Sequence, residues 1–124
     1  MNILELEQKT LQELRTIAHE FNLPRPNRYK KENIILQIAR AWGESEGLEI
    51  RGGILEIMSE GIGFLRQDYH VGAEDVYVSQ AQLRRYELRS GDMVIGHVRP
   101  PRESERHYGL LKVEYVNGLN PEEA

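Results

Sequence analysis

Apolar residues in the first part of the chain recur at intervals of three and four, the spacing of an amphipathic helix. The positions concerned are Leu11, Leu14, Ile17, Ala18 and Phe21. Thr10 and Glu13 just before them form the T-x-x-E pattern of an N-terminal capping box. Asn22-Leu23-Pro24 ends the predicted helix, and Pro26-Asn27 keeps the connection non-helical, because proline has no amide hydrogen to donate.

A second helical pattern begins near Lys31. Its apolar face comprises Ile34, Ile35, Ile38, Ala41 and Trp42. Residues 43–47, with the sequence GESEG, have the composition of a linker. We therefore predict a helical minidomain over residues 1–47, which is small enough to need support from its neighbour.

From Leu48 the apolar period shortens towards two, which indicates strands. The predicted strands are 54–58, 62–66, 76–78, 93–98 and 108–116, and Ser79 is placed to cap a helical turn over Gln80–Tyr86. The prediction is an α+β chain whose residues 48–118 form a five-stranded, cold-shock-like OB-fold barrel, followed by an acidic tail or linker over 119–124. Small barrels of the SH3 type produce similar strand patterns.

The composition narrows the classes of protein. The chain has 124 residues and no cysteine, no apolar run near the roughly 18 residues of a membrane span, and acids where a signal peptide carries bases. We expect a cytoplasmic protein without disulfides and without membrane contact. The four histidines are scattered, so we expect no metal site.

The net charge is −4, which argues against indiscriminate binding to nucleic acid. Residues 84–106 nevertheless carry six arginines against four acids. The six are Arg84, Arg85, Arg89, Arg99, Arg102 and Arg106. They are candidates for phosphate contacts, although arginines of small domains are usually solvated or paired with carboxylates.

The second predicted strand carries the most suggestive chemistry, in the sequence GIGFLR over residues 61–66. Ile62, Phe64 and Arg66 share one face because side chains alternate along a strand, and Gly63 between them lets a flat base approach. An aromatic ring can stack on a base while a nearby guanidinium contacts the base edge or a phosphate. The alternative is that Phe64 belongs to the core and Arg66 is a solvated charge.

The surrounding sequence resembles the RNA-binding region of Rho transcription termination factors. The recurring pieces, in order, are GFLR at 63–66, DVYVS at 75–79, LRRYELRSGD at 83–92, RPP at 99–101 and SERHY followed by LLKV at 104–113. LQELRTIAHEFNL at 11–23 and KKENIILQI at 30–38 resemble the helical motif that precedes the barrel in that family. The resemblance implies binding of single-stranded, pyrimidine-rich RNA with a preference for cytosine.

The resemblance also implies a role for individual residues. Phe64 would stack on one base, and Arg66 and Asp75 would contact its Watson–Crick edge. A carboxylate accepts from the exocyclic amine of cytosine, whereas uracil presents a carbonyl there. Tyr77, Glu105 and His107 would form a second pocket, with the alternative that Tyr77 is a core residue. The predicted RNA-binding set is Met58, Ile62, Phe64, Arg66, Asp75, Tyr77, Glu105, Arg106, His107 and Tyr108.

Two positions depart from the family pattern. The family usually has an aromatic residue in place of Ile62, and more often tyrosine than histidine in place of His107. Both departures reduce the flat π surface, and a base–aromatic stack contributes roughly 1–3 kcal/mol. The two departures therefore bear on the strength and the cytosine selectivity of RNA binding, and not on the fold.

The sequence contains no G-x-x-x-x-G-K-[ST] phosphate loop and no clustered catalytic residues, so we expect a binding module without enzymatic activity or cofactor. The family implies a longer parent, a homohexameric ATP-dependent RNA translocase whose motor holds ATP and Mg²⁺ and whose partners include RNA polymerase and elongation factors. We expect the present stretch alone to be monomeric. Two other functions fit the pattern, namely a protein-interaction adaptor built on the OB groove and a general cold-shock-like RNA chaperone.

Overall fold

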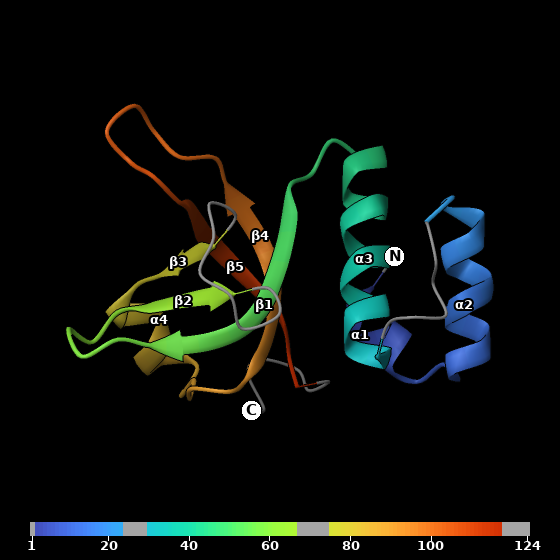
Figure 1. Cartoon of the computed structure of the whole chain (residues 1–124), viewed down its shortest axis with the longest axis horizontal. Coiled ribbons are helices and arrows are strands. Elements are labelled where there is room, and N and C mark those ends of the chain that lie inside the picture. The colour runs from blue at the N-terminus through green and yellow to red at the C-terminus, as the bar shows by residue number, and fades with distance from the viewer. Residues whose placement is uncertain (1, 24–29, 67–74, 118–124) are drawn as a thin grey trace.

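A computed structural model describes residues 2–23, 30–66 and 75–117. Three helices come first, namely α1 (Ile3–Glu7), α2 (Leu11–Glu20) and α3 (Lys31–Ser45). The strands that follow are β1 (Ile50–Ile57), β2 (Gly63–Arg66), β3 (Val76–Val78), β4 (Met93–Arg99) and β5 (Tyr108–Val116), with α4 (Gln80–Arg85) between β3 and β4. Helices α1, α2 and α3 lie together on one side of the strands, and α3 stands alongside β1 (Figure 1).

The predicted capping box of α2 is confirmed. The Glu13 amide donates to Thr10 Oγ1 at 3.1 Å, and the Thr10 amide donates to Glu13 Oε1 at 2.9 Å. The bond from the Thr10 amide and, after it, the Thr10 side chain lower the pKa of the Glu13 carboxyl. The backbone reverses at Asn22, whose φ is 58°. The predicted stop at Pro24 and the Pro26-Asn27 connection lie outside the described residues.

The helical region differs from the sequence prediction in two places. The short helix α1 was not predicted, although Asn2 Oδ1 caps it by accepting from the Leu4 amide at 2.9 Å. Part of the predicted linker is helical, because α3 extends to Ser45. Gly43 is buried, and a Cβ there would meet the Ile50 side chain at 2.9 Å. The glycine therefore allows α3 to approach β1 closely.

The five strands form a closed barrel in the order β1-β2-β3-β5-β4, which confirms the predicted α+β chain with an OB-type barrel. Neighbouring strands are antiparallel except β3 and β5, which pair in parallel with Val76 opposite Tyr108. Ser79 caps α4 as predicted and forms a capping box with Gln82. Gln82 Nε2 also donates to the Leu110 carbonyl at 2.8 Å, which ties α4 to β5.

The buried side chains form two clusters, and one of them crosses from helices to barrel. In this shared core, Ile50, Met93, Ile95 and Tyr115 of the strands pack with the buried residues of α1, α2 and α3. The Tyr115 hydroxyl donates to Glu7 Oε2 at 2.9 Å, and burial together with this bond raises the pKa of Tyr115. The second cluster fills the barrel around Leu55, Leu65 and Val76.

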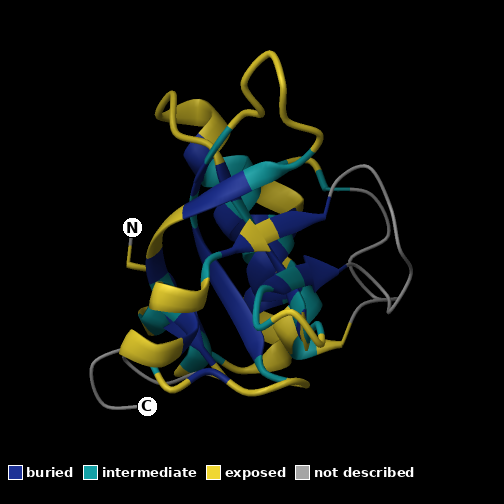
Figure 2. Ribbon diagram, turned by 90° about the vertical axis from the view of Figure 1, so that its left-hand side faces the viewer, coloured by how far each residue is buried: buried dark blue, intermediate teal, exposed yellow. Residues whose placement is uncertain are grey.

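The two buried clusters determine which residues are exposed to solvent. Buried positions concentrate in the strands, whereas residues 101–106 between β4 and β5 are all exposed (Figure 2). Over the described ranges, no helix combines the length and apolar character that crossing a membrane requires. The expected tail 119–124 lies outside the described residues, and the expected boundaries at residues 47 and 118 stay predictions.

Candidate nucleic-acid interface

Three rings meet on the outer surface of the barrel. Phe64 of β2 lies opposite Tyr77 of β3 in the strand register, and their ring centroids are 6.0 Å apart at an interplanar angle of 68°. His107, just before β5, lies 5.0 Å from Phe64 at 65°. We call Phe64, Tyr77 and His107 the ring cluster. Leu65 between the outward positions is fully buried, so Phe64 faces outwards and does not belong to the core.

Tyr77 also lies outside the core, with 37% of its surface exposed. The alternative in which it is a core residue is therefore wrong. His107 is partly buried, and its buried Nδ1 has no hydrogen-bond partner among the described residues. The ring cluster thus offers one exposed ring, Tyr77, and two partly exposed rings that meet edge to face.

Gly63, the second glycine of the GIGFLR segment, has a different role from the one expected. A Cβ on Gly63 would lie 2.7 Å from Leu55 Cδ1, inside the barrel. Gly63 therefore makes room for the core and does not open the outer face to a base. Ile62 precedes β2, and its carbonyl accepts from the Met58 amide at 2.8 Å, which closes the turn between β1 and β2.

Arg66 and Asp75 form a buried ion pair beside Phe64. Arg66 is 7% exposed and Asp75 3% exposed, and Nη1 donates to Oδ2 at 3.0 Å. Arg66 Nη2 lies 3.8 Å from the sulfur of Met58. The alternative in which Arg66 is a solvated charge is therefore wrong.

A third partner of Arg66 was not anticipated. Glu56 Oε1 lies 2.6 Å from Arg66 Nε, in an ion pair whose N–H is not aligned for a hydrogen bond. Glu56 stands opposite Phe64 in the β1–β2 register, and Arg66 follows on the same face two positions later. This contact can be predicted only when the strand pairing is known, because the pairing makes Glu56 and Arg66 diagonal neighbours on one face.

The guanidinium carbon of Arg66 lies 5.4 Å from the Phe64 ring centroid. A flat group stacked on Phe64 would thus have a cation and a carboxylate within reach of its edge. Four of the residues that the family resemblance assigned to RNA binding, Met58, Phe64, Arg66 and Asp75, lie together here.

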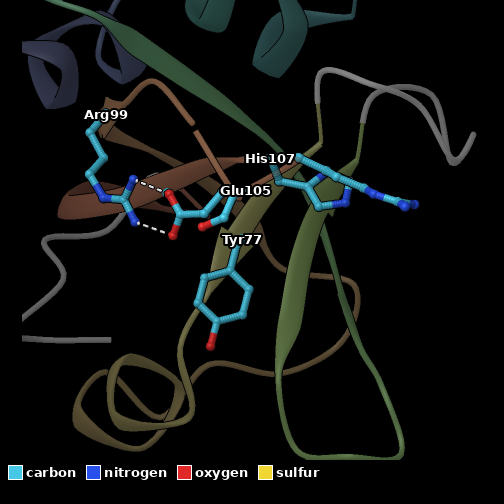
Figure 3. Close-up of a pocket in the computed structure, with 7 residues that line it drawn as sticks. Tyr77, Arg99, Glu105 and His107 are labelled. Atoms are coloured by element: carbon cyan, nitrogen blue, oxygen red, sulfur yellow. Dashed lines mark hydrogen bonds and ion pairs between the residues drawn. The ribbon is translucent and has the colours of Figure 1, made fainter. Parts of the chain in front are cut away.

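A pocket of about 460 Å³ opens next to the ring cluster (Figure 3). It is lined by Tyr77, Arg99, Ser104, Glu105, Arg106, His107 and Gly109. The predicted Tyr77, Glu105, Arg106 and His107 therefore come together. Arg99 had been considered only as a phosphate contact, and Ser104 and Gly109 were not predicted.

Glu105 is held by a two-pronged ion pair across the pocket. Arg99 Nη1 donates to Oε1 at 2.7 Å and Nη2 donates to Oε2 at 2.9 Å (Figure 3). The Arg102 amide adds a bond to Oε1 at 3.0 Å. These bonds, Arg99 first, lower the pKa of the Glu105 carboxyl to about 2, and the Glu105 contact raises the pKa of Arg99.

Tyr108 and Ile62, which lies in the turn before β2, are the two predicted residues that neither site includes, and Tyr108 faces the other way. Its ring packs against the barrel core, with the guanidinium carbon of Arg51 3.9 Å from the ring centroid. Alternation along the chain turns Tyr108 away from the face that presents His107. Of the six arginines considered for phosphate contact, Arg99 and Arg106 line the pocket. Within the described part of the chain, no three His, Asp or Glu side chains gather as a metal site would need.

Comparison with protein-family models matches both halves of the chain. Residues 51–122 match the model described as "Rho termination factor, RNA-binding domain". Residues 5–47 match the model described as "Rho termination factor, N-terminal domain". Neither model describes a motor domain, in line with the expectation of a binding module.

Individual relatives agree with the family models. The chain is 46% identical over 126 residues to transcription termination factor Rho of Bacillus subtilis (strain 168). It is 44% identical over 128 residues to the Rho of Pseudomonas aeruginosa and 43% identical over 128 residues to that of Escherichia coli (strain K12). Each match covers 100% of this chain and 30% of the relative, so the chain spans about 30% of the length of these curated relatives. The chain belongs to the Rho transcription termination factor family and carries the RNA-binding domain of that family.

Proposed function

We propose that the ring cluster, the buried Arg66–Asp75 pair and the adjacent pocket together bind single-stranded, pyrimidine-rich RNA with a preference for cytosine. The observation that carries this proposal is a desolvated cation–carboxylate pair beside an outward-facing aromatic ring, with the Arg66 guanidinium carbon 5.4 Å from the Phe64 ring centroid. Single-stranded RNA offers unstacked bases, which need a flat ring for the base face and polar groups for the base edge.

The first base stacks on Phe64 and directs its edge towards Arg66 and Asp75. Cytosine offers an amine to the carboxylate and a ring nitrogen and carbonyl to the guanidinium. Uracil offers a carbonyl where cytosine has the amine, so Asp75 disfavours it. Burial strengthens this selection, because an unsatisfied or repelled group in a desolvated site costs more than in water.

The second base enters the pocket between Tyr77 and His107. Glu105 faces this pocket as an acceptor, so it favours a base that carries an amine on the exposed edge. Arg106 lines the same pocket and contacts the strand as a cation. A pyrimidine needs less space than a purine between these two rings, each of which is held by contact with Phe64.

For the whole protein we propose the activity implied by the family. The present stretch anchors nascent RNA, and the remaining length of the parent supplies an ATP- and Mg²⁺-dependent translocase that ends transcription. We expect the parent to be a homohexamer acting in the bacterial cytoplasm together with RNA polymerase and elongation factors. The present stretch alone is expected to be a monomer that does not hydrolyse ATP.

Filter binding of the purified chain to oligocytidine, oligouridine and oligoadenosine tests the proposal at one fixed salt concentration. Affinity in the order cytidine, uridine, adenosine is expected. Equal affinity for all three would favour a general RNA chaperone, and no binding to any of them would favour a protein-interaction adaptor.

A further inference from the structure

We propose that Arg99 is a positioning residue that aims the Glu105 carboxylate into the pocket, and that cytosine selection at the second base depends on it. This inference deepens the proposed function and rests on it. Arg99 itself is not expected to touch the base.

The guanidinium of Arg99 is fixed from several sides. It binds both oxygens of Glu105, and its Nη1 also donates to the Pro100 carbonyl at 3.2 Å. Arg99 lies opposite Gly109 in the β4–β5 register, and a Cβ on Gly109 would lie 3.4 Å from the guanidinium carbon. No side chain therefore separates the guanidinium from the β5 backbone.

The hydrogen bonds leave Glu105 one defined acceptor position. Oε1 accepts from both Arg99 Nη1 and the Arg102 amide. Oε2 accepts only from Arg99 Nη2 among the described residues. A carboxylate oxygen has two lone-pair positions, so the remaining position on Oε2 is the one that a base amine can use. A planar, two-pronged pair fixes the direction of that position.

The ion pair also fixes the charge state of the acceptor. Because the pKa of Glu105 is lowered to about 2, the carboxyl stays ionised far below neutral pH and never presents a competing hydroxyl donor to the base. The stabilisation that accompanies this lowered pKa is present above the ordinary value of 4.5 and is lost as the pH falls through about 2.

Arg102 provides a matched control. It lies on the same exposed segment and carries the same charge, but only its backbone amide binds Glu105. Arg102→Gln therefore removes one positive charge and leaves both prongs of the Arg99–Glu105 pair in place. Arg99→Gln removes the same charge together with the prongs.

The experiment compares the ratio of oligocytidine to oligouridine dissociation constants for the natural chain, the single variants Arg99→Gln, Arg102→Gln and Glu105→Gln, and the double variant Arg99→Gln/Glu105→Gln. Arg99→Gln should reduce the preference for cytidine at least about threefold, because a hydrogen bond to a charged acceptor is weakened. Combining it with Glu105→Gln should add no further loss. Arg102→Gln should weaken both oligonucleotides alike and keep the ratio.

NMR titration of the Glu105 carboxyl in the free proteins supplies a readout independent of RNA. The pKa should rise towards 4.5 in Arg99→Gln and change much less in Arg102→Gln, because the charge of Arg102 contributes least to the lowering. Arg99→Lys, which keeps the charge but has a single ammonium, should give an intermediate ratio and serves as a second variant if Arg99→Gln folds poorly.

Two results would overturn the inference. If Arg99→Gln or Arg99→Lys lowers the affinity for both oligonucleotides equally, Arg99 contacts phosphate and does not position Glu105. If the Glu105 pKa stays near 2 without Arg99, another group holds the carboxylate. If instead the natural chain does not prefer cytidine, the proposed function fails and not the role of Arg99 alone.

Discussion

At the scale of single residues, strand alternation predicted which side chains face outwards but not how they are paired. Phe64 faces outwards as expected, while Leu65 next to it fills the core. The burial of Arg66 depends on Glu56 from β1 and on Asp75, which immediately precedes β3. No local pattern around Arg66 specifies these partners, so the sequence alone left open whether this arginine was solvated.

Phe64→Ala should weaken oligocytidine binding by about 1–3 kcal/mol, the contribution of one base–aromatic stack. The melting temperature should change little, because the ring lies outside both buried clusters. Leu65→Ala is the adjacent control, since it removes a fully buried side chain and should lower stability by about 2–5 kcal/mol. Titration and thermal melting of both variants separate the two effects. A Phe64 variant that melts much earlier yet keeps its affinity would place the ring in the core.

Asp75→Asn should reduce the preference for cytidine over uridine more than it reduces overall affinity. An amide can turn either a donor or an acceptor towards the base, whereas a carboxylate only accepts. The change should also cost up to about 3 kcal/mol of stability, because it weakens a buried ion pair.

Glu56→Gln is the control for Asp75→Asn, since Glu56 pairs with the same arginine from a side chain that is 55% exposed. Dissociation constants for both oligonucleotides at equal salt give the ratio. A ratio that is unchanged in Asp75→Asn, or reduced as much in Glu56→Gln, would remove Asp75 from base recognition.

His107→Tyr should tighten oligocytidine binding by up to about 1 kcal/mol, the lower end of a base–aromatic stack. His107 already contacts Phe64 and lines the pocket, so a larger ring there extends the stacking surface. Tyr108→Phe controls for a general effect of hydroxyl groups, because Tyr108 faces the core side. Equal affinities of the natural and His107→Tyr chains at pH 7.5 would indicate that position 107 does not meet the base.

At the scale of elements, the sequence predicted features that depend on neighbouring residues along the chain. It did not predict features that depend on contacts between elements. The capping box at Thr10 and the helix cap at Ser79 are sequence patterns, and both form as predicted. Helix α1 has only five residues, too few for a clear apolar period. In the sequence, Gly43 looks like part of a linker. A glycine is needed there because Ile50 of β1 packs closely against it, and this contact is between elements and not along the chain.

The pocket depends on a pairing between distant elements. The parallel pairing of β3 with β5 places Tyr77 opposite Gly109 and thereby beside the segment that carries Glu105 and His107. These positions are about thirty residues apart, and periodicity does not specify which strands become neighbours. The family resemblance predicted that Tyr77, Glu105 and His107 gather, whereas the role of Arg99 required the register.

At the scale of the whole molecule, helices and barrel share one core. Ile38 of α3 is fully buried in the cluster that also contains Met93 and Tyr115. Ile38→Ala should therefore lower stability by about 2–5 kcal/mol for both parts together. Trp42, the single tryptophan, packs against this core, so its fluorescence reports the unfolding of the helices. The NMR signals of the backbone amides in β2 and β3 report the unfolding of the barrel.

For Ile38→Ala the two probes should shift to lower denaturant concentration by the same amount. A shift seen by Trp42 alone, with the barrel signals unmoved, would mean that the helices unfold independently. Leu11→Ala on the exposed face of α2 is the control and should move neither probe appreciably.

The most direct test of the central claim is an NMR titration of the whole chain with a short oligocytidine, in which every backbone amide is followed. The account predicts that the largest shifts fall on residues 63–66, 75–78 and 104–109, which carry the ring cluster, the Arg66–Asp75 pair and the pocket. An equal concentration of oligoadenosine should produce markedly smaller shifts at the same residues. Shifts concentrated on α2 and α3, or equal responses to the two oligonucleotides, would contradict it.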